Sequence, residues 1–173
     1  MIGELDIWPR IEAGLRGAVP LTLTVMLVVL GAMPLGVPAL GPIMPLFPLM
    51  AIFYWVIHRP DRFPYLGTFL IGLFQDVLAG TPLGMSALVL VAVHAAVASQ
   101  RKFFHGKSFM VLWSGFAVLA SGAAALNWVL AMGFYASLAS PTPALFQLLL
   151  TVALFPCLTW FFRLVRRDLL RPT

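Results

Sequence analysis

Charged residues are scarce in this chain. They make up 10% of its 173 residues, and only six of them are acidic. Hydrophobic residues make up 61%, and the mean hydropathy is +0.99. Soluble globular domains usually carry about 25% charged residues. The composition therefore excludes an ordinary soluble domain and indicates an integral membrane protein.

Cysteine is almost absent too. The single residue, Cys157, excludes a disulfide within the chain and any cysteine-based metal cluster. The three histidines show no metal-ligand spacing. A net charge of +5 could suggest nucleic acid, but the basic residues are spread over four segments that flank apolar runs. Membrane topology and anionic headgroups explain them better, so we expect no metal, no cofactor and no nucleic acid.

Six apolar runs divide the chain. A membrane span needs about 20 apolar residues to cross a hydrocarbon core of roughly 30 Å. The runs lie at about 17–36, 42–58, 65–79, 83–100, 108–135 and 143–163. We therefore predict an all-α, polytopic membrane protein with one transmembrane domain of six helices over 17–163. An interfacial cytoplasmic segment over 1–16 precedes it, and a basic cytoplasmic tail over 164–173 follows.

The basic residues all fall on one side of the membrane when these runs are read as spans. The three connections on the other side, around 36–42, 79–82 and 135–143, contain no Lys or Arg. Excess Lys and Arg mark cytoplasmic connections, so we predict that both termini are cytoplasmic. The basic residues are Arg10, Arg16, Arg59, Arg62, Arg101, Lys102, Lys107, Arg163, Arg166, Arg167 and Arg171.

Prolines interrupt two of the predicted spans. Pro42, Pro45 and Pro48 stand at the start of the second run, and Pro156 lies inside the sixth. Proline lacks a backbone donor and kinks a helix. We therefore expect an irregular entrance to the second span that neighbouring helices must cover, and a bend in the sixth span.

Asp76 is the main candidate for a functional residue. A carboxylate near the middle of a span costs about 2.5–3.5 kcal/mol, so Asp76 should face protein or water. Gly72 and Gly80 share its helix face, Gln75 flanks it, and Gly84 follows in the next turn. This glycine-lined groove predicts either a site for a partner, proton or cation, or an internal staple that accepts hydrogen bonds from a neighbouring helix.

Other polar residues stand alone on apolar helices. His94, Asn127 and Gln147 could form an intramembrane polar network, although a satisfied hydrogen bond between helices is the simpler interpretation of each. Arg59 and Arg62 lie in a compact cytoplasmic turn. They could contact anionic lipid or a cytoplasmic partner, or serve only to set topology.

Catalytic motifs are missing from the sequence. It contains no nucleophile elbow, no zinc-protease motif, no P-loop, and no second intramembrane acid to pair with Asp76. We therefore expect a protein that is not an enzyme. Two classes of function remain: a scaffold that docks another protein's transmembrane helix, and a small-molecule binding subunit of a transporter.

An ordered set of residues within 48–84 resembles the MreD family, the small multispan subunit of the bacterial rod-shape (elongation) machinery. The chain length, Pro156 and the basic C-terminus also fit, although the set covers only about a fifth of the chain. The set consists of Tyr54-Trp55, Pro60 and Phe69-x-x-Gly72-x-x-x-Asp76-x-x-x-Gly80-x-x-Leu83-Gly84.

The resemblance implies a non-enzymatic, multi-pass protein of the bacterial inner (cytoplasmic) membrane that maintains cell shape. Its partners would be MreC, a single-span protein with a periplasmic coiled coil, and through it RodA and its penicillin-binding transpeptidase. MreB filaments and RodZ would adjoin the cytoplasmic side.

The six-helix arrangement of the family also looks like the substrate-binding subunits of energy-coupling-factor vitamin transporters. That likeness supports the rival function, with a pocket lined by Asp76, His94, Asn127 and Gln147. The short outward connections speak against a substrate lid. The first span also lacks the Ala-x-x-x-Ala stripe with which such subunits dock their coupling partner.

Overall fold

The computed structural model describes residues 7–33, 44–135 and 142–169, with the side chains of 7–17, 166, 168 and 169 left aside. Every regular element in these ranges is helical, which confirms the all-α prediction. The elements are α1 (Ile7–Ala32), α2 (Phe47–His58), the 3-10 helix η1 (Pro60–Arg62), α3 (Tyr65–Ala79), α4 (Met85–Phe104), α5 (Phe109–Tyr135) and α6 (Thr142–Leu169).

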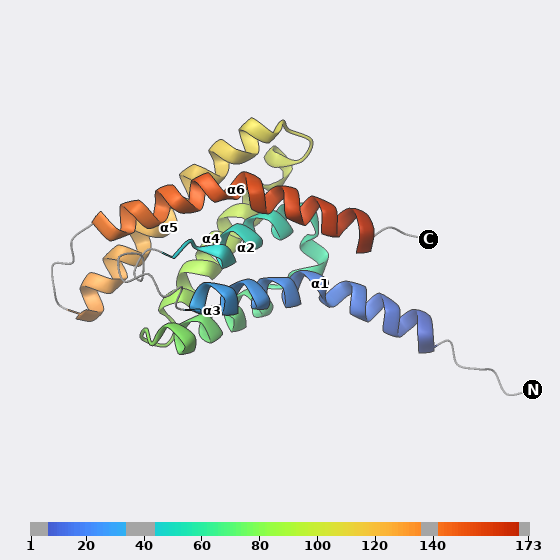
Figure 1. Cartoon of the computed structure of the whole chain (residues 1–173), viewed down its shortest axis with the longest axis horizontal. Coiled ribbons are helices and arrows are strands. Elements are labelled where there is room, and N and C mark those ends of the chain that lie inside the picture. Colours follow the sequence, from blue (N-terminus) through green and yellow to red (C-terminus); the bar gives the residue numbers. More distant parts are fainter. Residues whose placement is uncertain (1–6, 34–43, 136–141, 170–173) are drawn as a thin grey trace, which may run out of the picture.

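The helices follow the predicted apolar runs. α3 coincides with the predicted 65–79, and α5 begins one residue later than predicted. α1 starts well before the predicted span, so residues 7–16 of the expected interfacial segment are helical, and its first turns extend beyond the bundle in Figure 1. α6 continues to Leu169, into the predicted tail. The membrane borders at 17 and 163 stay predictions.

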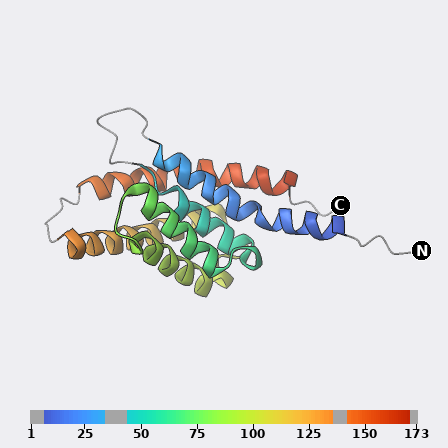
Figure 2. The same cartoon turned by 90° about the horizontal axis from the view of Figure 1, so that it is seen from below.

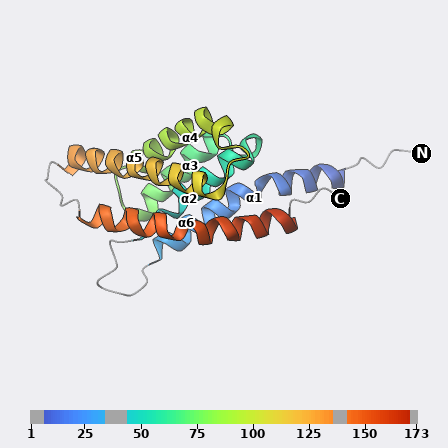
Figure 3. The same cartoon turned by 90° about the horizontal axis from the view of Figure 1, so that it is seen from above.

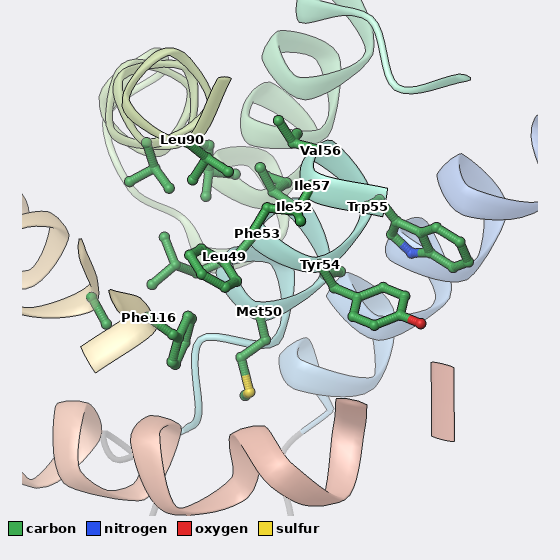
Figure 4. Packing of buried hydrophobic residues seen from close by; sticks show 14 of the residues in the cluster. Leu49, Met50, Ile52, Phe53, Tyr54, Trp55, Val56, Ile57, Leu90 and Phe116 are labelled. Atoms are coloured by element: carbon green, nitrogen blue, oxygen red, sulfur yellow. The ribbon is translucent and has the colours of Figure 1, made fainter. Parts of the chain in front are cut away.

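α2 lies at the centre of the bundle, in contact with α1, α4, α5 and α6. Every residue from Pro48 to Ile57 is buried. Figure 4 shows the reason: side chains leave α2 on all sides, Met50 towards α6 and Trp55 towards α1. A helix that is apolar around its whole circumference is either enclosed by other helices or surrounded by lipid, and the burial of α2 shows that other helices enclose it.

Phe53 joins three outer helices at this centre. Its ring meets Phe104 of α4, Phe116 of α5 and Phe155 of α6 edge-on, with centroids 5.7, 5.3 and 5.6 Å away. Phe116 and Phe155 stack on each other at 4.1 Å. Lipid tails are as apolar as these rings, so close packing rather than the hydrophobic effect holds such a core together in a membrane.

The entrance to α2 is irregular, as the prolines predict. Residues 44–46 are not helical, and α6 satisfies the backbone groups exposed there. Gln147 Nε2 donates a hydrogen bond to the carbonyl of Met44 at 2.7 Å, and the N–H of Leu46 donates to Thr151 Oγ1 at 3.0 Å. The expectation that neighbours cover this entrance is therefore confirmed. Pro42 lies outside the described residues.

Pro156 lies near the middle of α6, and the helix continues on both sides of it. Figure 1 shows α6 changing direction in this region, so the predicted bend is confirmed. Proline produces such a bend because it removes one helical hydrogen bond and its ring pushes against the preceding turn.

Three described helices meet the length and hydropathy criteria for a membrane span: α4, α5 and the part of α6 from Thr142 to Val165. The apolar part of α1 (Ala18–Ala32), α2 and α3 are shorter. With 12 residues, α2 is only about 18 Å long, against roughly 30 Å of hydrocarbon. Six helices are confirmed, and six crossings stay a prediction.

The outside of the bundle is apolar over much of its area. Large hydrophobic side chains are exposed on α1, α3, α4, α5 and α6, among them Met26, Leu66, Leu88, Val118 and Leu149. Soluble monomers rarely expose so much apolar surface. Figure 2 and Figure 3 show the start of α1 and the end of α6 at the same end of the bundle. This arrangement agrees with the predicted placement of both termini on one side, which stays a prediction.

Replacement of Phe53 by alanine tests the centre of the bundle. We expect Phe53→Ala to lower the free energy of unfolding by about 3–5 kcal/mol, because it opens a cavity among three rings. Thermal unfolding of the protein in detergent measures the loss. The matched control is Phe146→Ala on the exposed side of α6. Equal melting temperatures for the two variants would contradict a central role of Phe53.

Candidate functional site

Asp76 points into the connection between α3 and α4 and is fully buried. Its Oδ1 accepts hydrogen bonds from Thr81 Oγ1 and from the N–H of Ser86, both at 2.9 Å. Its Oδ2 accepts one from the N–H of Gly84 at 2.8 Å. Both carboxylate oxygens are therefore occupied by groups of the same chain.

Asp76 forms hydrogen bonds both at the end of α3 and at the start of α4. Gly80 takes the left-handed conformation (φ 66°), and the N–H groups of Gly80 and Thr81 donate to the backbone carbonyl of Asp76. This is a Schellman-type end of α3. The first N–H groups of a helix lack helical partners, and the Asp76 carboxylate accepts from those of Gly84 and Ser86 at the start of α4. A negative charge near the N-terminus of α4 also interacts favourably with the dipole of that helix.

Gly72 lies one turn before Asp76, where α3 crosses α4. A Cβ atom at Gly72 would stand 2.3 Å from Ala87 Cα and 2.6 Å from Ala87 N, so only glycine fits. At Gly72, the predicted glycine-lined groove thus allows close approach of two helices of this chain. Gly80 and Gly84 belong to the turn, with positive φ angles and open space around them.

Gln75 faces a different direction and lines two cavities. One, of about 370 Å³, lies among α1, α2, α3 and α6 and is also lined by Gln147. The other, of about 30 Å³, is also lined by Ser86 and Asn127. Gln75 Oε1 is buried and accepts no hydrogen bond within the described structure.

The three residues of the predicted polar network lie in three separate places. His94 Nδ1 shares a hydrogen bond of 2.6 Å with Thr68 Oγ1, and its ring stacks on Tyr65 at 4.0 Å. Gln147 bonds to the α2 entrance, and Asn127 borders the small cavity. His94 thus makes a hydrogen bond between α4 and α3, which is the simpler interpretation given above, and Gln147 instead bonds to the non-helical segment before α2.

Arg59 directly precedes η1, and Arg62 is its last residue. The N–H of Arg59 donates to the carbonyl of Trp55 at 2.7 Å, and that of Arg62 to the carbonyl of Arg59 at 3.1 Å. One guanidinium nitrogen of Arg62 is buried without a hydrogen-bond partner among the described residues. Contact of these two residues with lipid or a cytoplasmic partner stays a prediction.

Sequence reasoning missed the hydroxyl partners. Thr81 supports the carboxylate, Thr68 pairs with His94, and Thr151 covers the α2 entrance. The available signal was a hydroxyl group inside or beside an apolar run, because such a group requires a partner away from water. Within the described residues, no group of three His, Cys, Asp or Glu side chains could hold a metal ion.

Substitution of Asp76 tests its capping role. We expect Asp76→Ala to cost about 3 kcal/mol of stability, since it leaves two buried N–H groups unpaired. Asp76→Asn should cost less, because its carbonyl oxygen still accepts while its amide faces the N–H of Gly84. Hydrogen exchange over residues 80–88 should accelerate in the same order. Unchanged exchange in Asp76→Ala would show that the carboxylate does not hold this turn.

Gly72→Ala tests the close approach of α3 and α4. The added methyl group meets backbone atoms of Ala87, so we expect the melting temperature to fall, by the equivalent of about 1–3 kcal/mol. Gly122→Ala in α5 is the matched control, because nothing lies within 4 Å of its Cβ position. We expect that variant to be neutral or slightly stabilised. Similar behaviour of both variants would refute the tight crossing.

No curated protein and no solved structure matches the chain, so the likeness to energy-coupling-factor subunits stays a prediction. Residues 14–167, most of the chain, match the family described as rod shape-determining protein MreD. The resemblance inferred from the residues around Asp76 is thereby confirmed: the chain belongs to the MreD family of rod shape-determining proteins.

Proposed function

We propose that this chain is a non-enzymatic scaffold of the bacterial inner membrane that binds the transmembrane helix of MreC. Through MreC it helps to activate and localise peptidoglycan synthesis by RodA and its penicillin-binding transpeptidase. MreB and RodZ belong to the same larger complex. Family membership gives the coarser statement, a membrane protein of rod shape determination, and the specific partners are part of the proposal.

The hydrogen bonding of the Asp76 carboxylate is the main support for the proposal. Its carboxylate is fully buried and accepts three hydrogen bonds from its own chain, so it is engaged in holding α3 against α4. An acid held in this way does not suit proton transfer or cation binding. What the hairpin of α3 and α4 offers to a partner is therefore its outer surface.

Two residues of the family motif lie on that outer surface. Phe69 on α3 is 44% exposed, and Leu83 in the connection is 68% exposed. The other motif residues of this hairpin serve its interior or its turn, whereas these two apolar side chains contribute little to packing. They are suited to contact a helix of another membrane protein, where van der Waals packing drives association.

Phe69→Ala and Leu83→Ala test the docking surface. We expect each to reduce recovery of MreC with the purified protein at least fivefold and to round the cells, while the melting temperature stays unchanged. Phe146→Ala and Leu149→Ala on α6 are matched controls with similar exposure. Normal rods and undiminished MreC in both α3–α4 variants would exclude this surface.

Asp76→Leu and Gly72→Leu serve as a second arm. Both disturb the hairpin interior, so we expect them to weaken MreC recovery together with the melting temperature. Loss of MreC without loss of stability in Asp76→Leu would instead assign the carboxylate directly to partner binding.

The cavity beside Gln75 favours one rival, a vitamin-type binding subunit of a transporter. Its volume of about 370 Å³ falls in the range of small-molecule pockets, and it presents an unpaired amide oxygen. Native mass spectrometry of the purified protein separates the two functions. A stoichiometric small molecule supports the transporter subunit, and a bound MreC helix supports the scaffold.

A further inference from the structure

A groove runs between the end of α4 and the start of α5, away from the Asp76 hairpin. It has a volume of about 350 Å³ and opens to the outside of the bundle, with Gln100, Phe103, Phe104, Ser114, Gly115 and Val118 along it. The ring of Phe104 packs directly against Gly115, since a Cβ atom at Gly115 would stand 2.3 Å from Phe104 Cε1. The lining is mostly apolar, so the groove suits a hydrocarbon chain.

A cation lies beside one of the residues that line this groove, Phe103. Lys107, in the connection between the two helices, places its Nζ 5.6 Å from the centroid of the Phe103 ring. Attraction between an ammonium group and an aromatic face holds the Lys107 side chain over the Phe103 ring. No ion pair to Lys107 occurs among the residues that the structure describes, so its charge is not neutralised there.

We propose that this groove binds an anionic phospholipid, with one acyl chain along Phe103, Gly115 and Val118 and the headgroup phosphate at Lys107. Charge complementarity selects the ligand: an apolar groove lies beside a cation that has no ion-pair partner among the described residues. Basic pockets between transmembrane helices at the cytoplasmic face bind anionic headgroups by the same chemistry. The predicted topology puts Lys107 at that face. The inference is independent of MreC binding.

Lys102 provides a matched control for Lys107. It carries the same charge near the same end of α4, but lies about 200° around the helix from Gln100, on the side away from the groove. A diffuse basic surface would depend equally on both lysines, whereas a built site depends on Lys107 alone.

Native mass spectrometry of the full chain in detergent, titrated with phosphatidylglycerol and phosphatidylcholine, tests the proposal. We expect preference for phosphatidylglycerol, and a loss of that preference by about fivefold in Lys107→Gln. Lys107→Arg should restore it, and Lys102→Gln should leave it unchanged. Val118→Trp should block the groove and reduce binding of both lipids, while Val129→Trp, further along α5, should not.

Two results would overturn the lipid site. Equal effects of Lys107→Gln and Lys102→Gln, or no effect of either, would reduce it to general attraction between charges. Cross-linking of a photoreactive residue at position 118 to a protein helix in cells, with no lipid adduct, would assign the groove to a protein partner instead.

Discussion

A buried carboxylate in an apolar bundle must obtain its hydrogen bonds from the protein, because lipid supplies none. Asp76 obtains three, two from the connection between α3 and α4 and one from the first turn of α4. The tight crossing at Gly72 depends on the same turn, because a looser connection would not hold Ala87 against the glycine backbone. The acid is thus tolerated in the membrane because it completes the start of a helix. Most of the residues that carry the family resemblance, from Phe69 to Gly84, form this one helical hairpin.

The second constraint is that no backbone group in the bundle may remain unpaired. Prolines break the approach to α2, and side chains of α6 replace the missing partners. Gln147 and Thr151 therefore supply hydrogen-bond partners to the backbone just before α2, although more than a hundred residues separate them from it in sequence. Gln147, which from the sequence could have been a ligand, here donates a hydrogen bond to a neighbouring segment.

Much of the fold was predictable from the sequence, because apolar runs and prolines act locally. The limits of α3 followed from its apolar run, and the irregular α2 entrance followed from its prolines. The central position of α2 was not predictable, since a short run of apolar residues reads alike whether lipid or protein surrounds it. Asp76 was recognised as needing shelter. Its donors were not identified, because two are backbone N–H groups whose direction depends on the left-handed turn at Gly84.

The buried position of α2 also has a consequence for biogenesis. Ribosomes deliver the helices in chain order, so α2 enters the bilayer before α5 and α6, which later surround it. Lipid can solvate its apolar side chains during that interval, but the carbonyl of Met44 and the N–H of Leu46 await α6. The hairpin of α3 and α4 needs no later segment for its own hydrogen bonds. A chain that stalls before α6 would therefore hold a complete α3–α4 hairpin beside an α2 entrance that lacks two hydrogen-bond partners.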